Sequence, residues 1–152
     1  MHDTLTPRPA TAAPHFAGKL IVKHDPRRTE YVEAMGLTFV DVEIRRTVDD
    51  VEAITERMMV DSGATDSVIP ADVLSDLGVK PVDELQYELA DGSLVTLARA
   101  PVVMRLLGTT VGTTVIFGPT GEKALLGVTV LESLGATLDA KTRTLTRRPT
   151  RL

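Results

Sequence analysis

The chain contains no cysteine and no tryptophan among its 152 residues. It can therefore have no disulfide framework, no thiolate zinc site and no cysteine nucleophile. Aromatic residues make up only 3% of the sequence, so the core is expected to consist of aliphatic side chains and methionine. This length is enough for one domain that buries such a core without covalent staples.

Long apolar runs and a strong net charge are also missing. No apolar stretch approaches the roughly 20 residues that a membrane-spanning helix needs. The N-terminus shows no signal-peptide pattern, so we expect a cytoplasmic protein without a membrane partner. The formal net charge of −4 gives no reason to expect nucleic acid as a partner.

Proline and histidine gather near the N-terminus, where all three histidines lie. The prolines leave little room for regular structure, so we predict a flexible arm over residues 1–30, in which residues 16–22 could dock as a strand. A globular domain is expected over residues 31–148 and a short tail over 149–152. Solvated histidines in an arm are preferred to metal capture, and no metal or cofactor is expected.

Apolar and polar residues alternate in several short segments, the pattern of half-buried strands. Strands are predicted at residues 36–44, 54–60, 101–107, 111–117 and 124–126, and a closing hairpin at 138–145. Short helices are predicted at 71–78 and 129–134, and these two segments weakly repeat one another. Together they indicate an all-β, partly closed barrel of short strands with two small helices.

The strongest hairpin signal lies in the middle of the chain. The β-prone runs 87–90 and 93–97 flank Asp91-Gly92, a dipeptide that favours tight hairpin turns.

One motif carries chemistry. The apolar strand that ends at Val60 delivers Asp61 into a tight Ser-Gly turn, Ser62-Gly63. A carboxylate beside a small hydroxyl residue and a glycine resembles half of an acid-protease active site. No second Asp-Ser/Thr-Gly occurs in the sequence, so this resemblance implies a homodimer that supplies the two carboxylates.

These residues resemble the retropepsin-like aspartic proteases, and most of all a group of small bacterial single-lobe members. The matching segments are 60–65, 67–70, 88–93, 125–135 and 138–139. The resemblance implies an acid-protease barrel with a flap hairpin, and an aspartic endopeptidase that acts on peptides or proteins. Two departures stand out: the family more often has Thr at Ser62, and retroviral members have Arg where Val128 stands.

The resemblance also implies a role for each matching residue. Asp61 would be catalytic and would form a dyad with Asp61 of a second copy. Supporting residues would be Ser62, Gly63, Leu126 and Gly127. Substrate-binding residues would be Gly63, Ala64, Ala90, Asp91, Gly92 and Ser93. The C-terminal strand around residues 142–146 is the candidate for pairing between the two copies.

The sequence also offers alternatives to an aspartic protease. Ser62 as a nucleophile lacks a histidine base, because no histidine follows His24. Residues 118–123 lack the spacing of a phosphate-binding loop, and the basic C-terminal end lacks aromatic residues for base stacking. The serious rival is a catalytically silent barrel of the same fold that serves as a dimerisation or peptide-binding module.

Overall fold

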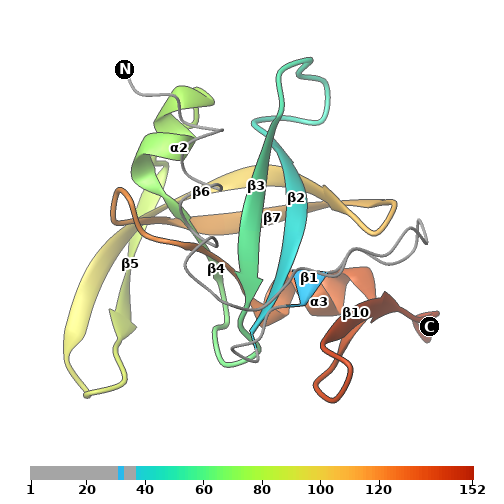
Figure 1. The fold of residues 1–152 in the computed structure, drawn as a ribbon. Coiled ribbons are helices and arrows are strands. Elements are labelled where there is room, and N and C mark those ends of the chain that lie inside the picture. Colours follow the sequence, from blue (N-terminus) through green and yellow to red (C-terminus); the bar gives the residue numbers. More distant parts are fainter. Residues whose placement is uncertain (1–30, 33–36) are drawn as a thin grey trace.

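Strands dominate the computed structural model, which describes residues 31–32 and 37–152. The elements follow one another as β1 (Tyr31–Val32), β2 (Thr38–Arg45), β3 (Ile54–Val60), β4 (Ser67–Pro70), α2 (Ala71–Asp76), β5 (Asp83–Glu88), β6 (Leu94–Leu106), β7 (Thr109–Gly118), β8 (Ala124–Leu126), α3 (Val128–Leu134), β9 (Ala136–Asp139) and β10 (Thr144–Arg147) (Figure 1). The predicted N-terminal arm, with its histidines and its possible strand, lies outside the described residues. The last four residues, 149–152, are exposed and belong to no helix or strand.

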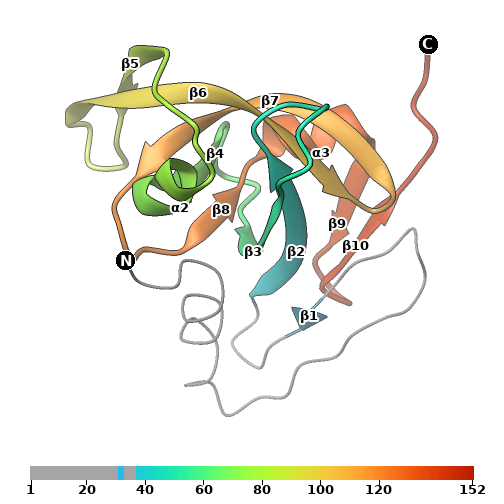
Figure 2. The same cartoon turned by 90° about the horizontal axis from the view of Figure 1, so that it is seen from above.

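The barrel closes because β2 pairs at both of its edges. The sheet order is β1-β2-β3-β8-β4-β7-β6-β5, and an additional pairing of β2 with β6 joins six of these strands into a ring (Figure 2). β3 runs parallel to β8 and β4 runs parallel to β7, whereas the other pairings are antiparallel. The predicted all-β barrel with two short helices is therefore confirmed.

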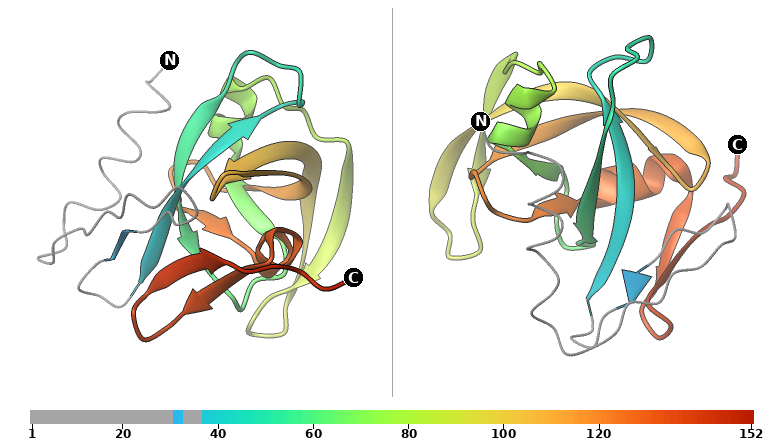
Figure 3. Two further views of the ribbon diagram at one scale, coloured as in Figure 1. Left: turned by 90° about the vertical axis from the view of Figure 1, so that its right-hand side faces the viewer. Right: turned by 45° about the horizontal axis from the view of Figure 1, so that its top comes forward.

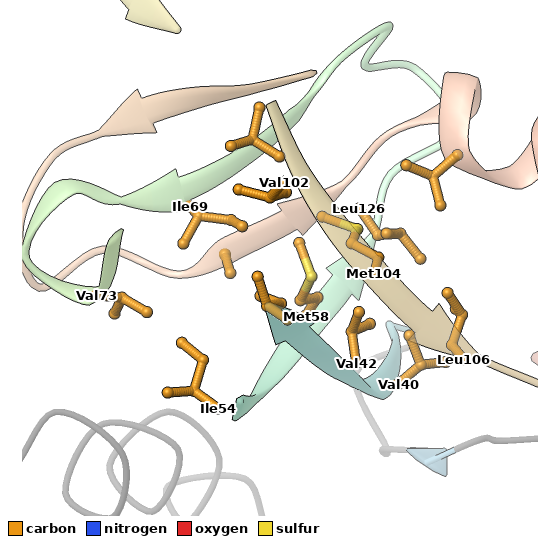
Figure 4. Packing of buried hydrophobic residues seen from close by; sticks show 14 of the residues in the cluster. Val40, Val42, Ile54, Met58, Ile69, Val73, Val102, Met104, Leu106 and Leu126 are labelled. Atoms are coloured by element: carbon orange, nitrogen blue, oxygen red, sulfur yellow. The ribbon is translucent and has the colours of Figure 1, made fainter. Parts of the chain in front are cut away.

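Aliphatic and methionine side chains fill the barrel, as the composition predicts. In β2, Val40, Val42 and Ile44 are fully buried, and in β3 the alternate residues Met58 and Val60 face the same interior. Figure 4 shows Val40, Val42 and Met58 meeting residues of β4, β6 and β8 in one cluster. Burial of one face of each strand fixes its register, because a slip of one residue would turn the apolar face outward.

Both helices begin directly after a short strand and end before a glycine. α2 follows β4, and Gly78 beyond it has φ of +85°; α3 follows β8, and Gly135 caps it with φ of +65°. A left-handed backbone of this kind is strained for residues with a side chain, which is why glycine ends both helices. The weak repeat in the sequence thus corresponds to two strand–helix units.

The central hairpin differs in detail from the prediction. Its strands pair from Asp83 opposite Arg99 to Glu88 opposite Leu94, and beyond them the N–H of Leu89 donates to the carbonyl of Ser93 and the N–H of Gly92 to the carbonyl of Leu89. The turn is therefore wider than Asp91-Gly92 alone. The predicted strands 93–97 and 101–107 are one strand, β6, which changes partner from β5 to β7 at Arg99. The pattern of apolar residues did not predict that these segments form one strand, because the two halves of β6 pair with different strands, and that pairing is decided by the tertiary structure. The short strand β4 was not predicted as a strand.

Three features lie on the same side of the barrel. They are the loop after β3, the tip of the β5–β6 hairpin and the C-terminal hairpin β9–β10, which all lie at the bottom of Figure 1 and of the left panel of Figure 3. β9 and β10 form a separate two-stranded sheet.

Within the described residues, no helix is long and apolar enough to cross a membrane.

Candidate functional site

Asp61 is the first residue after β3, and β8 determines where it lies. Its main-chain N–H donates a hydrogen bond of 3.0 Å to the carbonyl of Leu126. This bond extends the parallel ladder in which Val60 lies opposite Leu126. We call residues 61–66 the Asp61 loop. Its first residue is therefore held by the barrel wall itself.

The carboxylate of Asp61 closes a tight turn with the residues that follow. Its Oδ1 atom accepts a hydrogen bond of 2.9 Å from the N–H of Gly63, and the N–H of Ala64 donates to the Asp61 carbonyl over 3.1 Å. A Cβ atom at Gly63 would lie only 3.3 Å from that oxygen, so a small residue suits the turn. Within the described residues the carboxylate makes no other hydrogen bond, which leaves its second oxygen available to a water molecule or a substrate.

The far end of the loop is attached to the start of α3. The N–H of Val128 donates to the carbonyl of Ala64 over 2.8 Å. Thr129 donates twice to the carbonyl of Thr65, from its N–H over 3.1 Å and from its hydroxyl over 2.8 Å. The Asp61 loop is thus held by hydrogen bonds at both ends, and its conformation does not depend on the loop sequence alone.

Gly127 occupies the point where the loop and α3 come closest. Its buried N–H donates to the hydroxyl of Ser67 over 2.9 Å. A Cβ atom on Gly127 would lie 2.6 Å from the carbonyl carbon of Asp66 and 2.8 Å from the carbonyl oxygen of Thr65. Leu126 is fully buried. The structure therefore places Leu126 and Gly127 directly against the Asp61 loop.

The other predicted site residues lie at the surface. Ser62 and Gly63 are exposed, and Ala64 is half-buried. Ala90, Asp91, Gly92 and Ser93 form the exposed turn of the β5–β6 hairpin. In that turn the hydroxyl and the N–H of Ser93 both donate to Asp91, and these hydrogen bonds hold the pKa of the Asp91 carboxyl below its usual value.

Two side chains that the sequence interpretation did not select connect the hairpin to the loop. The hydroxyl of Tyr87, in β5, donates a hydrogen bond of 2.9 Å to Oδ2 of Asp66. Strand alternation could have indicated Tyr87, because it shares the face of β5 that carries Leu85. No local pattern indicates that Asp66 is its partner. Ser67 was also missed as a support of the site.

The described residues contain no cluster of side chains suited to a metal ion. Across residues 31–32 and 37–152, no group of three or more His, Cys, Asp or Glu side chains is arranged to hold a metal ion. The chemistry available at the site is that of a carboxylate, a neighbouring hydroxyl and main-chain groups.

Comparisons with known proteins agree with the fold and with the motif. The chain is similar to the crystal structure of a retropepsin-like aspartic protease from Rickettsia conorii, with a TM-score of 0.56 and 18% identity over 74% of this chain and 83% of that one. It also matches the solution structure of simian foamy virus (mac) protease, with a TM-score of 0.47 and 20% identity over 63% of this chain and 93% of that one. No curated protein matches the sequence.

The Rickettsia protein shares the retropepsin-like fold, which confirms the predicted fold class. Residues 40–130, more than half of the 152 in the chain, match the family described as aspartyl protease. The matched range contains the strand β3, the Asp61 loop, the β5–β6 hairpin and Gly127. This chain therefore belongs to the aspartyl protease family.

Proposed function

We propose that the chain is an aspartic endopeptidase whose active form is a homodimer. The observation that supports this most directly is the position of Asp61. Asp61 is half-buried at the end of β3, its carboxylate accepts a hydrogen bond from the N–H of Gly63, and it lies in a loop braced by β8 and α3. Membership of the aspartyl protease family supports a peptide or a protein as the substrate.

The reaction needs two carboxylates. Two carboxyl groups about 3 Å apart cannot both be ionised, because their negative charges repel, so the pair shares one proton. The ionised carboxylate takes a proton from water as the water oxygen bonds to the peptide carbonyl carbon, and the protonated carboxyl then gives its proton to the leaving nitrogen as the C–N bond breaks. The sequence holds one Asp-Ser-Gly, so the second carboxylate is Asp61 of another copy.

Two surfaces suit a symmetric dimer. Ser62 is exposed beside Asp61, where its hydroxyl would donate a hydrogen bond across the two-fold axis. Among the described strands, β10 pairs with β9 alone, so the other edge of β10 is open to a strand from a second copy. The hairpin that contains β10 lies on the same side of the barrel as the Asp61 loop, to which Ser62 belongs (Figure 3). A two-fold arrangement would use the same surface on both copies.

An extended peptide would lie between the Asp61 loop and the β5–β6 hairpin. The turn residues 90–93 would close over it and add main-chain hydrogen bonds. Ala64 offers fewer main-chain groups to a substrate than the sequence suggests. Its N–H already donates to the carbonyl of Asp61, and its carbonyl already accepts from the N–H of Val128. The carbonyl of Gly63 is the better main-chain acceptor for substrate.

The test compares wild type with Asp61→Asn in cleavage of a diverse peptide library between about pH 4 and pH 7, read by mass spectrometry. Asp76→Asn is the matched control, since it removes the same charge from an exposed position at the end of α2. Analytical ultracentrifugation of all three proteins measures the dimer. We expect cuts from wild type and Asp76→Asn, none from Asp61→Asn, and dimers throughout.

Two results would contradict the proposal. Cleavage that survives in Asp61→Asn would remove Asp61 from the chemistry. A wild-type dimer that binds peptides without cutting them would favour the peptide-binding module instead.

A further inference from the structure

The β5–β6 hairpin extends beyond the barrel as a two-stranded arm. Residues 94–98 of β6 pair with β5 alone, and only from Arg99 onward does β6 also pair with β7. β5 is the last strand of the sheet order. A two-stranded ribbon is only marginally stable by itself in water. The position of this arm over the Asp61 loop therefore depends on contacts between the two.

One such contact is the hydrogen bond from the Tyr87 hydroxyl to Oδ2 of Asp66, which is 2.9 Å long, half-buried and joins residues 21 apart. Burial, and then the hydrogen bond to Asp66, raises the pKa of the Tyr87 phenol above its usual value of 10.0. The phenol thus remains a donor throughout the pH range of acid proteolysis.

Asp66 is a rigid attachment point. On one side of it, the carbonyl of Thr65 accepts two hydrogen bonds from Thr129. On the other side, Ser67 is buried and accepts from Gly127. The main chain of Asp66 also lies so close to Gly127 that no Cβ would fit there. Displacement of Asp66 would disrupt the start of α3.

Tyr87 is held equally well on the hairpin. It lies opposite Val95 in β6, on the face that also carries the Asp83–Arg99 pair. The Arg99 guanidinium donates two hydrogen bonds to Asp83, of 3.0 and 2.9 Å, and lies beside the Tyr87 phenol. The hydrogen bond between Tyr87 and Asp66 therefore joins two well-ordered parts of the chain.

We propose that Tyr87 and Asp66 form a latch that holds the β5–β6 hairpin against the Asp61 loop and so fixes the space in which a peptide binds. This role rests on the peptidase function proposed above, in which Tyr87 is a positioning residue and Asp61 performs the chemistry. Loss of the latch lets the hairpin open more often, which weakens peptide binding. It leaves the Asp61 turn unchanged, because the hydrogen bonds of that turn come from Gly63, Ala64 and Leu126.

The test uses Tyr87→Phe, Asp66→Ala and the double variant. Tyr87→Phe keeps the ring and removes only the hydroxyl. Thr96→Val is the matched control, because it removes a hydroxyl from the exposed, opposite face of the same hairpin. Amide hydrogen exchange over residues 83–99 measures opening of the hairpin, and KM and kcat on a cleaved peptide measure its consequence.

We expect the hairpin amides to exchange about five- to tenfold faster in Tyr87→Phe, the range that corresponds to one hydrogen bond. Asp66→Ala should match it, and the double variant should add little, because both changes remove the same bond. KM should rise about three- to tenfold while kcat stays within about twofold, since peptide binding is affected and the reacting groups are not. Thr96→Val should resemble wild type in both measurements.

Exchange in Tyr87→Phe equal to that in Thr96→Val would overturn the latch. Faster exchange with an unchanged KM would overturn its role in peptide binding and leave a purely structural contact. If wild type cleaves no peptide, the peptidase proposal fails and takes that role with it. Faster, non-additive exchange in the variants would then still support a latch between hairpin and loop.

Discussion

The main-chain N–H of Gly127 donates a buried hydrogen bond of 2.9 Å to the hydroxyl of Ser67, a residue 60 positions earlier in the chain. This bond joins the start of β4 to the start of α3. Together with the bond from Asp61 to Leu126, it attaches both ends of the Asp61 loop to one short segment, β8 with the glycine after it. The conformation of the candidate catalytic loop is thus determined by residues far from it in sequence.

Replacement of Gly127 by alanine should damage both stability and activity. The added Cβ would lie 2.6 Å from the carbonyl carbon of Asp66, and that backbone cannot move without disturbing the Asp61 loop. We expect a loss of about 1–3 kcal/mol in the free energy of unfolding, measured in urea, and a loss of peptide cleavage. Gly112→Ala is the control, since no atom lies within 4 Å of a Cβ there. Equal stability of the two variants would refute this account.

Ser67→Ala should leave the buried N–H of Gly127 without its acceptor. A buried polar group that loses its partner costs about 1–3 kcal/mol, so the free energy of unfolding should fall by that amount. Ser133→Ala removes an exposed hydroxyl that donates to Thr129, and its effect should stay within about 0.5 kcal/mol. Thermal or urea unfolding of both variants would check this. A Ser67→Ala protein as stable as wild type would show that another group replaces the hydroxyl.

The stability of the hairpin should depend on acid pH through Asp83. Hydrogen bonds from Arg99 lower the pKa of the Asp83 carboxyl from its usual 3.8. A lowered pKa in the folded state means that the stabilisation is complete above about pH 3.8 and disappears as pH falls through the lowered value. The protection factors of the hairpin amides, which divide the intrinsic exchange rate at each pH by the measured rate, should therefore fall in this acid range in wild type. Asp83→Asn should show a smaller change with pH, and an identical pH dependence would contradict the prediction.

Tyr87 should make the hairpin less stable as pH rises in the alkaline range, the opposite direction from Asp83. Its pKa is raised from 10.0, chiefly by burial and next by the hydrogen bond to Asp66, so its stabilising effect is complete below about pH 10 and disappears as pH rises through the raised value. The ultraviolet absorbance of tyrosinate measures this directly. The titration of wild type minus that of Tyr87→Phe isolates one of the two tyrosines, and its midpoint should lie above 10.0. A midpoint at or below that value would contradict the structure around the phenol.

Much of the local structure could be predicted from the sequence. β3 and β8 have the predicted bounds, because alternating apolar residues define their buried faces. The two helices lie where predicted, because glycines end their apolar patterns. The Asp-Gly turn lies at the tip of a hairpin as expected, although the turn is wider than two residues. These features depend on neighbours within a few positions.

The contacts of the site could not be predicted in the same way. Tyr87 and Asp66 come from separate elements, and nothing in either segment indicates the other. Ser67 resembles any small polar residue at the start of a strand, and only its burial against Gly127 makes it a support of the loop. The continuity of β6 was missed because its two halves pair with different strands.

The sequence by itself determined both helices, several of the strands, the aliphatic core and the position of Asp61 in a tight turn after a buried strand, because periodicity and turn chemistry act over short distances. Only the tertiary structure decided that β3 and β8 run side by side and in parallel, that Gly127 lies against Asp66, and that Tyr87 reaches across to the loop. Those relationships arise when the barrel closes through β2 and β6. Closure depends on long-range pairing, which no single segment of the chain encodes.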